Sequence, residues 1–322
     1  MNKNFADILG KYKGRNIAIA VSGGIDSMAL MHMAANARIN AIALTVDHGL
    51  RTASAKEAKF VERIATQIGI PHVTLHWTGK KPKSGLENAA RIARYELLLD
   101  FCKNHGIEIL LTAHQADDQI ETFLMNLGRG SGIYGLAGMR AETARDGITI
   151  ARPLLSIPRS RLAEYCNKNK IEYVTDEMND DESFTRVRIR KNRHLLRDRL
   201  GIGDARILTA MESIGRVRGM LETDVDNLIK SVTNERAIFS AKFLFDQPDE
   251  LMMKFLSRLL QKIGQLPYPP RLEKIRRAIT LLENDCKFTV AHCIVRRLGT
   301  KILVAPEGES ASFNTINKKK KK

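Results

Sequence analysis

One stretch decides how this chain begins to fold: Asn16-Ile17-Ala18-Ile19-Ala20-Val21-Ser22-Gly23-Gly24-Ile25-Asp26-Ser27, followed directly by the helical run 28–37. Residues 17–21 are apolar and β-rich, a pattern that predicts a short buried strand. Gly23 and Gly24 allow the backbone to curl and to approach a ligand closely. The unpaired amides and positive dipole of a helix start attract an anion. The stretch therefore predicts a phosphate-binding loop between a strand and a helix.

The side chains of this loop indicate which phosphate group it binds. Ser22 and Ser27 can donate hydrogen bonds to phosphate oxygens, whereas the Asp26 carboxylate would repel a pyrophosphate unless a divalent cation lay between them. A Mg²⁺-bridged role for Asp26 is therefore the economical hypothesis. The alternative is a tight turn in which Asp26 or Ser22 only caps the helix. We assign the whole loop to nucleotide binding, that is, Ser22, Gly23, Gly24, Ile25, Asp26 and Ser27.

The first half of the chain alternates strands with longer helices. We expect strands at 17–21, 41–46, 72–76 and 109–113, and helices at 26–37, 53–69 and 86–104. Such alternation is typical of an α/β fold with a doubly wound parallel sheet. A nucleotide would bind at the carboxyl edge of that sheet.

The second half has a different pattern. After a last strand at 150–155 and a helix at 160–170, the chain is acidic and polar at 176–183 and then abruptly basic. Further on we expect helices at about 205–231, 249–263 and 270–282, and strands at 288–295 and 300–304. These elements predict a smaller C-terminal α+β domain. We divide the chain into a catalytic domain at 1–205, a domain at 206–317 that we expect to bind nucleic acid, and a disordered lysine tail at 318–322.

Composition narrows the class of protein. A net charge of +16 on 322 residues indicates a polyanionic partner, and nucleic acid is favoured over a membrane because no apolar run reaches the roughly 20 residues of a spanning helix. The amino terminus has no secretory signal pattern, so we expect a cytoplasmic protein. Its four cysteines form no C-x-x-C pair, which argues against a zinc or cluster site.

Polar residues follow two of the predicted strands. Asp47, His48 and Arg51 come at the end of the second strand, where they can face a nucleotide. In the alternative interpretation Asp47 caps the next helix and Arg51 is solvated.

A group of acids follows the fourth strand. Asp117 and Asp118 lie at a helix start, just after His114, and Glu121 lies one turn further on. We expect Asp26, Asp118 and Glu121 to hold a metal, although acids in a first turn can also simply complement the helix dipole.

Basic residues provide three candidate polyanion contacts. Arg91 and Arg94 share a helix face beside Glu87, which could equally be a solvated ion-pair face. Arg129 heads the glycine-rich stretch 128–138, which we interpret as a mobile cover over a phosphate or a flipped base rather than a simple connection. If 186–200 is one helix, its arginines form a single stripe, and Asp198 is the one acid nearby in the sequence that could neutralise it. We expect this stripe to follow the backbone of a nucleic acid. The stripe consists of Arg186, Arg190, Arg193 and Arg197.

Several strings carry a family resemblance: 46–51 (VDHGLR), 87–95 (ENAARIARY), 112–122 (TAHQADDQIET), 129–132 (RGSG) and 135–139 (GLAGM). With the 22–27 loop they resemble the tRNA(Ile)-lysidine synthetases, of the N-type ATP pyrophosphatase (PP-loop) superfamily. The resemblance implies an adenine nucleotide alpha hydrolase-like fold. It also implies an ATP-dependent ligase that joins L-lysine to C2 of the wobble cytidine in isoleucine tRNA with a CAU anticodon, through an adenylated cytidine.

The implied catalytic residues are Asp26, Asp117, Asp118 and His114, and the sequence does not choose a general base among the last three. A homodimer is left open. The rival interpretations are a tRNA thiolase, which would need paired cysteines, a small-molecule amidating ligase, which has no evident use for the net charge of +16, and a non-catalytic tRNA-binding module, which would not need an intact loop.

Overall fold

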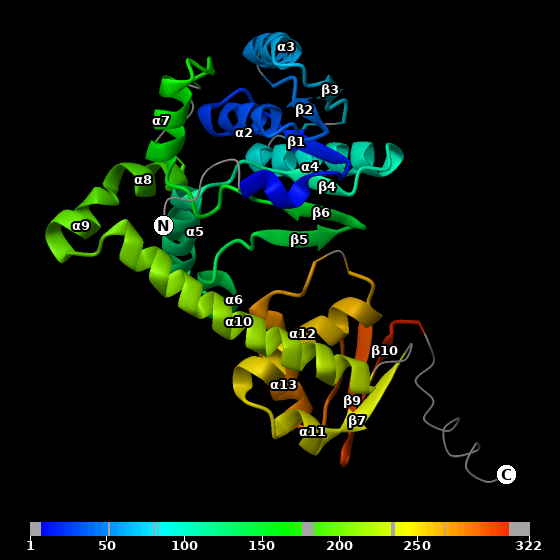
Figure 1. The fold of residues 1–322 in the computed structure, drawn as a ribbon. Coiled ribbons are helices and arrows are strands. Elements are labelled where there is room, and N and C mark those ends of the chain that lie inside the picture. Colours follow the sequence, from blue (N-terminus) through cyan, green and yellow to red (C-terminus); the bar gives the residue numbers. More distant parts are fainter. Residues whose placement is uncertain are drawn as a thin grey trace. The chain divides into compact units, whose positions relative to one another are not determined.

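The computed structural model describes residues 8–50, 52–79, 81–82, 84–175, 182, 184–232, 236–266 and 268–308 (Figure 1). The chain divides into two compact units, residues 1–215 and 216–322. The boundary predicted near residue 205 lies at the start of α10 (Asp204–Val232). The lysine tail lies outside the described residues, as does most of the acidic segment 176–183.

The first unit contains a six-stranded sheet in the order β3-β2-β1-β4-β6-β5. Its strands are β1 (Ile17–Ala20), β2 (Ala41–Asp47), β3 (His72–His76), β4 (Ile109–Leu111), β5 (Glu142–Arg145) and β6 (Ile148–Ala151). The first four pairings along the sheet are parallel, and β5 is antiparallel to β6. The predicted doubly wound parallel sheet is confirmed, and the edge strand β5 is an addition to it.

Helices cover both faces of this sheet because its central strand is apolar on both sides. Ile17 and Ile19 belong to the core formed with α2 (Ile25–Asn36), α3 (Thr52–Gln67) and α7 (Arg159–Lys168). Ala18 belongs to a second core that includes Leu98 and Cys102 of α4 (Leu86–Asn104). Successive residues of a strand point to opposite faces, so the run 17–21 serves two cores at once.

Three helices beyond the sheet complete the first unit. They are α5 (Ala116–Gly128), α8 (Thr185–Asn192) and α9 (His194–Leu200), and Ile120 of α5 packs with Ile207 and Met211 of α10. The single helix expected over 186–200 is wrong, because the chain breaks at Arg193 between α8 and α9. The glycine-rich stretch also contains one short helix, α6 (Ile133–Leu136), and a 3-10 turn, η1 (Gly10–Tyr12), precedes β1.

The second unit is an antiparallel sheet in the order β7-β10-β9-β8, packed with helices around a core that includes Phe255. Its elements are β7 (Ala237–Ser240), α11 (Ala241–Phe245), α12 (Asp249–Ile263), α13 (Leu272–Glu283), β8 (Lys287–Val290), β9 (Cys293–Leu298) and β10 (Lys301–Pro306). The strand expected at 288–295 is two strands, which are joined by a turn at Ala291 and His292, both with a φ of 56°. This unit is the predicted smaller α+β region.

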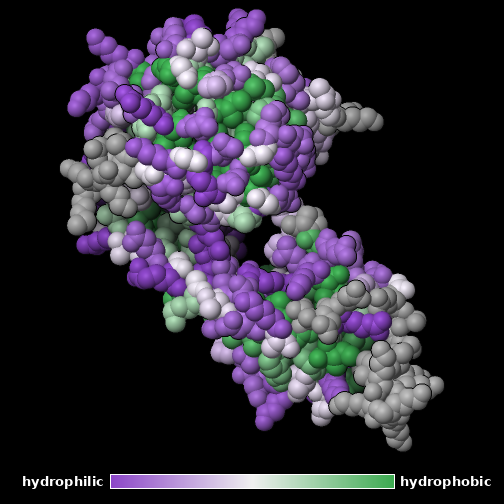
Figure 2. Space-filling view, turned by 45° about the vertical axis from the view of Figure 1, so that its right-hand side comes forward, coloured by the Kyte–Doolittle hydropathy of each residue, from purple (hydrophilic) through white to green (hydrophobic). Residues whose placement is uncertain are grey.

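The molecular surface is largely polar. Figure 2 shows hydrophilic side chains over most of the face it presents, interrupted by apolar ones. Within the described residues, no helix is both long and apolar enough to cross a membrane.

Candidate active site at the carboxyl edge of the sheet

The loop between β1 and α2 is held in shape by its own hydrogen bonds. Gly23 has a φ of 87°, and its carbonyl accepts from the Val174 amide at 2.9 Å. The Ser27 hydroxyl donates to the Gly24 carbonyl at 2.9 Å and accepts from the Ser22 amide at 3.2 Å. Because Ser27 has one hydroxyl hydrogen and uses it inside the loop, this side chain braces the turn. The exposed Ser22 remains the serine that can reach a ligand.

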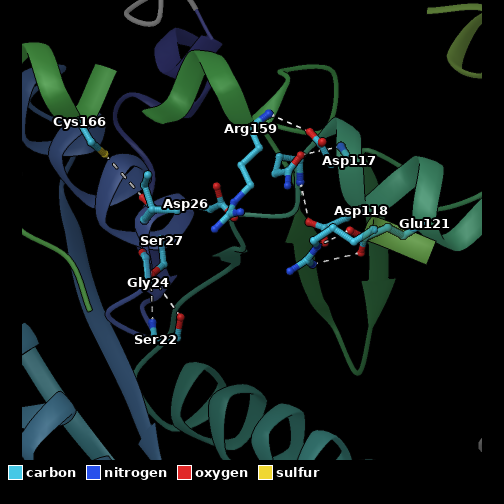
Figure 3. A network of polar contacts seen from close by, with 12 residues as sticks. Ser22, Gly24, Asp26, Ser27, Asp117, Asp118, Glu121, Arg159 and Cys166 are labelled. Atoms are coloured by element: carbon cyan, nitrogen blue, oxygen red, sulfur yellow. Dashed lines mark hydrogen bonds and ion pairs between the residues drawn. The ribbon is translucent and has the colours of Figure 1, made fainter. Parts of the chain in front are cut away.

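Asp26 lies in the first turn of α2 and is unusually short of partners. Its side chain is 27% exposed, and its nearest cation is Arg159, with Nε 4.0 Å from Asp26 Oδ2. Its buried Oδ1 has no hydrogen-bond partner among the described residues. Burial raises the pKa of the carboxyl to about 6, Arg159 opposes this, and the charges of Asp118 and Asp117 add to it. Asp26 is thus a desolvated carboxylate with a free oxygen (Figure 3).

The first turn of α5 is closed by a reciprocal cap. The Gln115 side chain accepts from the Asp117 amide at 2.6 Å, and Asp118 Oδ2 accepts from the Gln115 amide at 3.0 Å. Asp117 Oδ2 accepts from the Arg159 amide at 2.8 Å, while Oδ1 pairs with Arg193. Asp118 therefore takes part in capping α5, but both aspartates remain close enough to Asp26 to influence its charge.

Glu121 is engaged by two arginines. Its side chain is 0% exposed, and it accepts from Arg190 Nε at 2.7 Å and Arg190 Nη2 at 3.3 Å, with Arg186 Nε also 3.3 Å away. We expected Glu121 to join Asp26 and Asp118 around a metal, whereas in the structure both of its oxygens are engaged by arginines of α8. The residues that the structure describes contain no group of three His, Cys, Asp or Glu side chains able to hold a metal ion.

The predicted arginine stripe is largely neutralised. Besides the two arginines on Glu121, Arg193 pairs with Asp117 and with Asp204, the latter at 3.3 Å. The exposed Arg197 pairs with Asp198 at 2.8 Å. The expectation of an uncompensated stripe is wrong, because Glu121 and Asp117 of α5 and Asp204 of α10 supply counterions in addition to Asp198.

A basic cluster lies at the other side of the sheet edge. Burial, with Arg152, Arg91, Arg186 and Arg94 nearby, lowers the pKa of His114 to about 3, so this imidazole stays neutral. Its Nδ1 lies 2.9 Å from the hydroxyl of Thr112.

Arg94 and His48 continue this cluster. Arg94 Nε and His48 Nδ1 are both buried without a hydrogen-bond partner in the described chain. Burial lowers the pKa of both side chains. The two lie close enough together for the charge of Arg94 to lower the pKa of His48 further. Arg91, in contrast, is exposed, with its guanidinium 5.4 Å from the Tyr95 ring centre. Arg94 is therefore turned toward the sheet edge instead of lying on a solvated face.

The remaining predicted residues are less central. Asp47 accepts from the Gly49 amide at 2.8 Å and from the Ser54 hydroxyl at 2.6 Å, and these bonds lower the pKa of its carboxyl. Arg129 is exposed at the end of α5. The side chain of Arg51 lies outside the described residues, as does that of Glu87.

Comparison with known proteins decides the family. A family model described as a PP-loop domain matches residues 1–195. A tRNA(Ile)-lysidine synthase from Rhodopseudomonas palustris is 38% identical over 315 residues, which cover 90% of each chain. This chain belongs to the tRNA(Ile)-lysidine synthase family. Members from Bradyrhizobium diazoefficiens and Wolbachia pipientis are 36% and 32% identical, covering 90% and 95% of this chain and 89% and 74% of their own.

The resemblance inferred from the motifs is thereby confirmed, and the chain is an ATP-using PP-loop enzyme of the lysidine synthase family. Among solved structures, the U34-tRNA thiolase NcsA from Methanococcus maripaludis, with its 4Fe-4S cluster, is similar with a TM-score of 0.57. At 15% identity over 66% of this chain and 78% of that one, this similarity supports the fold alone.

Two residues of this lysidine synthase site were not predicted. Gln115 was quoted only as part of a string, although a polar residue before a helix that opens with acids is a recognisable cap signal. Arg159 follows a proline at a helix start, and nothing local in the sequence indicates that it reaches Asp26. Only the packing of α7 against α2 brings the two together.

Proposed function

We propose that this enzyme ligates L-lysine to C2 of the wobble cytidine in isoleucine tRNA with a CAU anticodon. In the first step the C2 oxygen attacks the α-phosphate of ATP and pyrophosphate leaves. In the second step the ε-amine of lysine attacks C2 and AMP leaves with the oxygen. The observation that carries the proposal is the braced 22–27 loop with the free Asp26 oxygen, in a chain of the lysidine synthase family.

Asp26 fits a Mg²⁺ ligand. A buried carboxylate oxygen without a donor is the kind of group that a hard cation binds, and Asp118 is the second carboxylate near it. When bound there, Mg²⁺ would neutralise charge that develops on the phosphates. Glu121 is not part of this proposal.

The chain's own groups supply the rest of the reaction. The amides at the start of α2 would hold the pyrophosphate portion of ATP. Arg94 and His48, whose buried nitrogens have no partner within the described residues, would bind a polar group of the RNA or of the nucleotide. His114 has too low a pKa to hold a proton at neutral pH, so we assign it hydrogen bonding and leave the base for the lysine ammonium to Asp117 or Asp118.

The RNA contacts are proposed at the exposed basic residues. Arg91 is exposed in the second turn of α4, and Arg129 is exposed after the C-terminal end of α5. The second unit would also take part in binding tRNA. Loss of one phosphate contact should lower the magnitude of the logarithmic salt slope of tRNA affinity by roughly 0.7 to 0.9.

A thiolase activity is disfavoured by the cysteines. Cys102, Cys166 and Cys293 belong to three different hydrophobic cores, and burial raises the pKa of each thiol to about 11. A sulfur carrier needs an accessible thiolate.

The test follows radiolabelled lysine and pyrophosphate together. We expect ATP-dependent incorporation of lysine into tRNA with a CAU anticodon, pyrophosphate release that requires this tRNA, and loss of both with Asp26→Ala. Pyrophosphate release without any RNA would indicate a small-molecule ligase, and no release would indicate a binding module. Incorporation of sulfur instead of lysine would establish the thiolase alternative.

A further inference from the structure

Arg159 connects the two acidic parts of the site. It is the first residue of α7, and its backbone amide donates to Asp117 at 2.8 Å while its side chain reaches within 4.0 Å of Asp26 (Figure 3). The helix behind it is firmly held, because Leu162 and Cys166 are buried in the core shared with α2. The Arg159 side chain itself is 46% exposed. The backbone is therefore anchored and the guanidinium is able to move.

The other cations near Asp26 are already engaged. Arg190 donates two hydrogen bonds to Glu121, and Arg193 pairs with Asp117. Within the described chain the Arg159 guanidinium makes no hydrogen bond, and its contact with Asp26 is a long ion pair. All five of its donors can thus serve a ligand.

A phosphate group at the loop would face unfavourable charge. Asp26, Asp117 and Asp118 lie close enough together that the latter two raise the pKa of the first. A pyrophosphate carries several negative charges, and of these acids only Asp117 is closely paired with a cation in the described chain, so a further cation is needed where the phosphates bind. An arginine is suited to this because its planar fork binds phosphate oxygens in pairs.

We propose that Arg159 is a phosphate-binding residue that moves from Asp26 to the pyrophosphate portion of ATP, and to the pyrophosphate that leaves. Without a ligand it partly balances the charge of Asp26. When the nucleotide binds, Asp26 is free for a cation and Arg159 contacts the phosphates. This assignment deepens the proposed function and rests on pyrophosphate binding at the 22–27 loop.

The experiment measures binding without turnover. The dissociation constant of inorganic pyrophosphate is determined by calorimetry in the presence of Mg²⁺, for the full chain and for Arg159→Gln, Arg159→Lys and Arg161→Gln. Glutamine at 159 keeps the backbone amide that donates to Asp117, so the anchor of α7 is preserved. Arg161 is the matched control, because it is equally exposed on the same helix but pairs with Glu164.

We expect Arg159→Gln to weaken pyrophosphate binding by about 10-fold or more, since a charge-assisted pair of hydrogen bonds is lost. The affinity of Arg159→Lys should lie between those of the wild type and Arg159→Gln, and Arg161→Gln should bind pyrophosphate like the wild type. Equal affinity of wild type and Arg159→Gln would overturn the assignment, as would an equal loss in Arg161→Gln. If the wild type itself does not bind pyrophosphate, the proposed function of the loop fails instead.

Discussion

Replacing Glu121 by glutamine should loosen α8 from α5 without removing a metal ligand. Glu121 is 0% exposed, whereas Arg186 and Arg190 are 41% and 33% exposed. Breaking a buried ion pair from one side costs about 3 to 5 kcal/mol. Here the arginines can turn partly into water, so we expect Glu121→Gln to lower the free energy of unfolding by about 2 kcal/mol.

Urea denaturation followed by tryptophan fluorescence suits this test. Trp77 is the only tryptophan of the chain and lies in the first unit, so its signal reports that unit separately from the second. With a slope of about 2 kcal/mol per molar urea, the expected loss moves the midpoint by roughly 1 M. Glu164→Gln is the control, because its pair with Arg161 is exposed and such pairs contribute about 0 to 1 kcal/mol.

The opposite result would restore the metal hypothesis. If Glu121→Gln is as stable as Glu164→Gln, but pyrophosphate release needs much more Mg²⁺, then Glu121 is a metal ligand and the ion pairs with α8 are not its main role. A double variant, Glu121→Leu with Arg190→Met, separates the explanations further. We expect it to recover part of the lost stability, because the Arg190 charge is removed together with its buried partner, while Arg186 is 41% exposed and can turn toward water.

Three further predictions concern the loop and the thiols. In EDTA, Asp26→Asn should stabilise the first unit by about 3 kcal/mol at pH 8. The pKa of the folded Asp26 carboxyl is about 6, above that of an unfolded aspartate, so its ionisation between roughly pH 4 and 6 lowers the stability of the wild type as pH rises. The two proteins should therefore converge in stability near pH 4. No gain at pH 8 would contradict this. Thr45 donates to the Val21 carbonyl just before the loop, so Thr45→Val should raise the KM for ATP while Thr45→Ser keeps it, and equal KM values would show that the hydroxyl does not position the loop. A thiol reagent at pH 8 should modify Cys286 first, because burial raises the pKa of the other three thiols to about 11, and two or more fast thiols would disprove this.

Elements with a strong local pattern could be predicted from the sequence. The strand at 72–76 and the helices at 86–104 and 249–263 agree with the structure at both ends. In each of them the periodicity of apolar residues and the flanking turn residues point to the same boundaries. The position of the site at the carboxyl edge of the sheet was also predictable, because it follows from the order and direction of the strands.

The pairing of charges could not be predicted in this way. The acids of α5 meet arginines of α8 that follow them much later in the chain, and only the packed structure brings them together. From the local sequence we therefore predicted that Glu121 is a metal ligand and that the arginines of α8 have no counterions. The turn at Ala291 and His292 was missed for a related reason, since neither residue is the glycine or asparagine that usually marks a left-handed turn.

The corrected pairing changes where a polyanion is expected to approach the first unit. A net charge of +16 must leave cations without counterions, but Arg186 and Arg190 of α8 pair with Glu121, and Arg193 after α8 pairs with Asp117. On the α4 side, in contrast, Arg94 has a buried nitrogen without a partner among the described residues, and the imidazole of His114 is kept neutral by burial and by the arginines around it. Unsatisfied buried donors cost free energy until a ligand binds them. We therefore expect the RNA to contact the α4 side of the site, at Arg94, more than the arginines of α8.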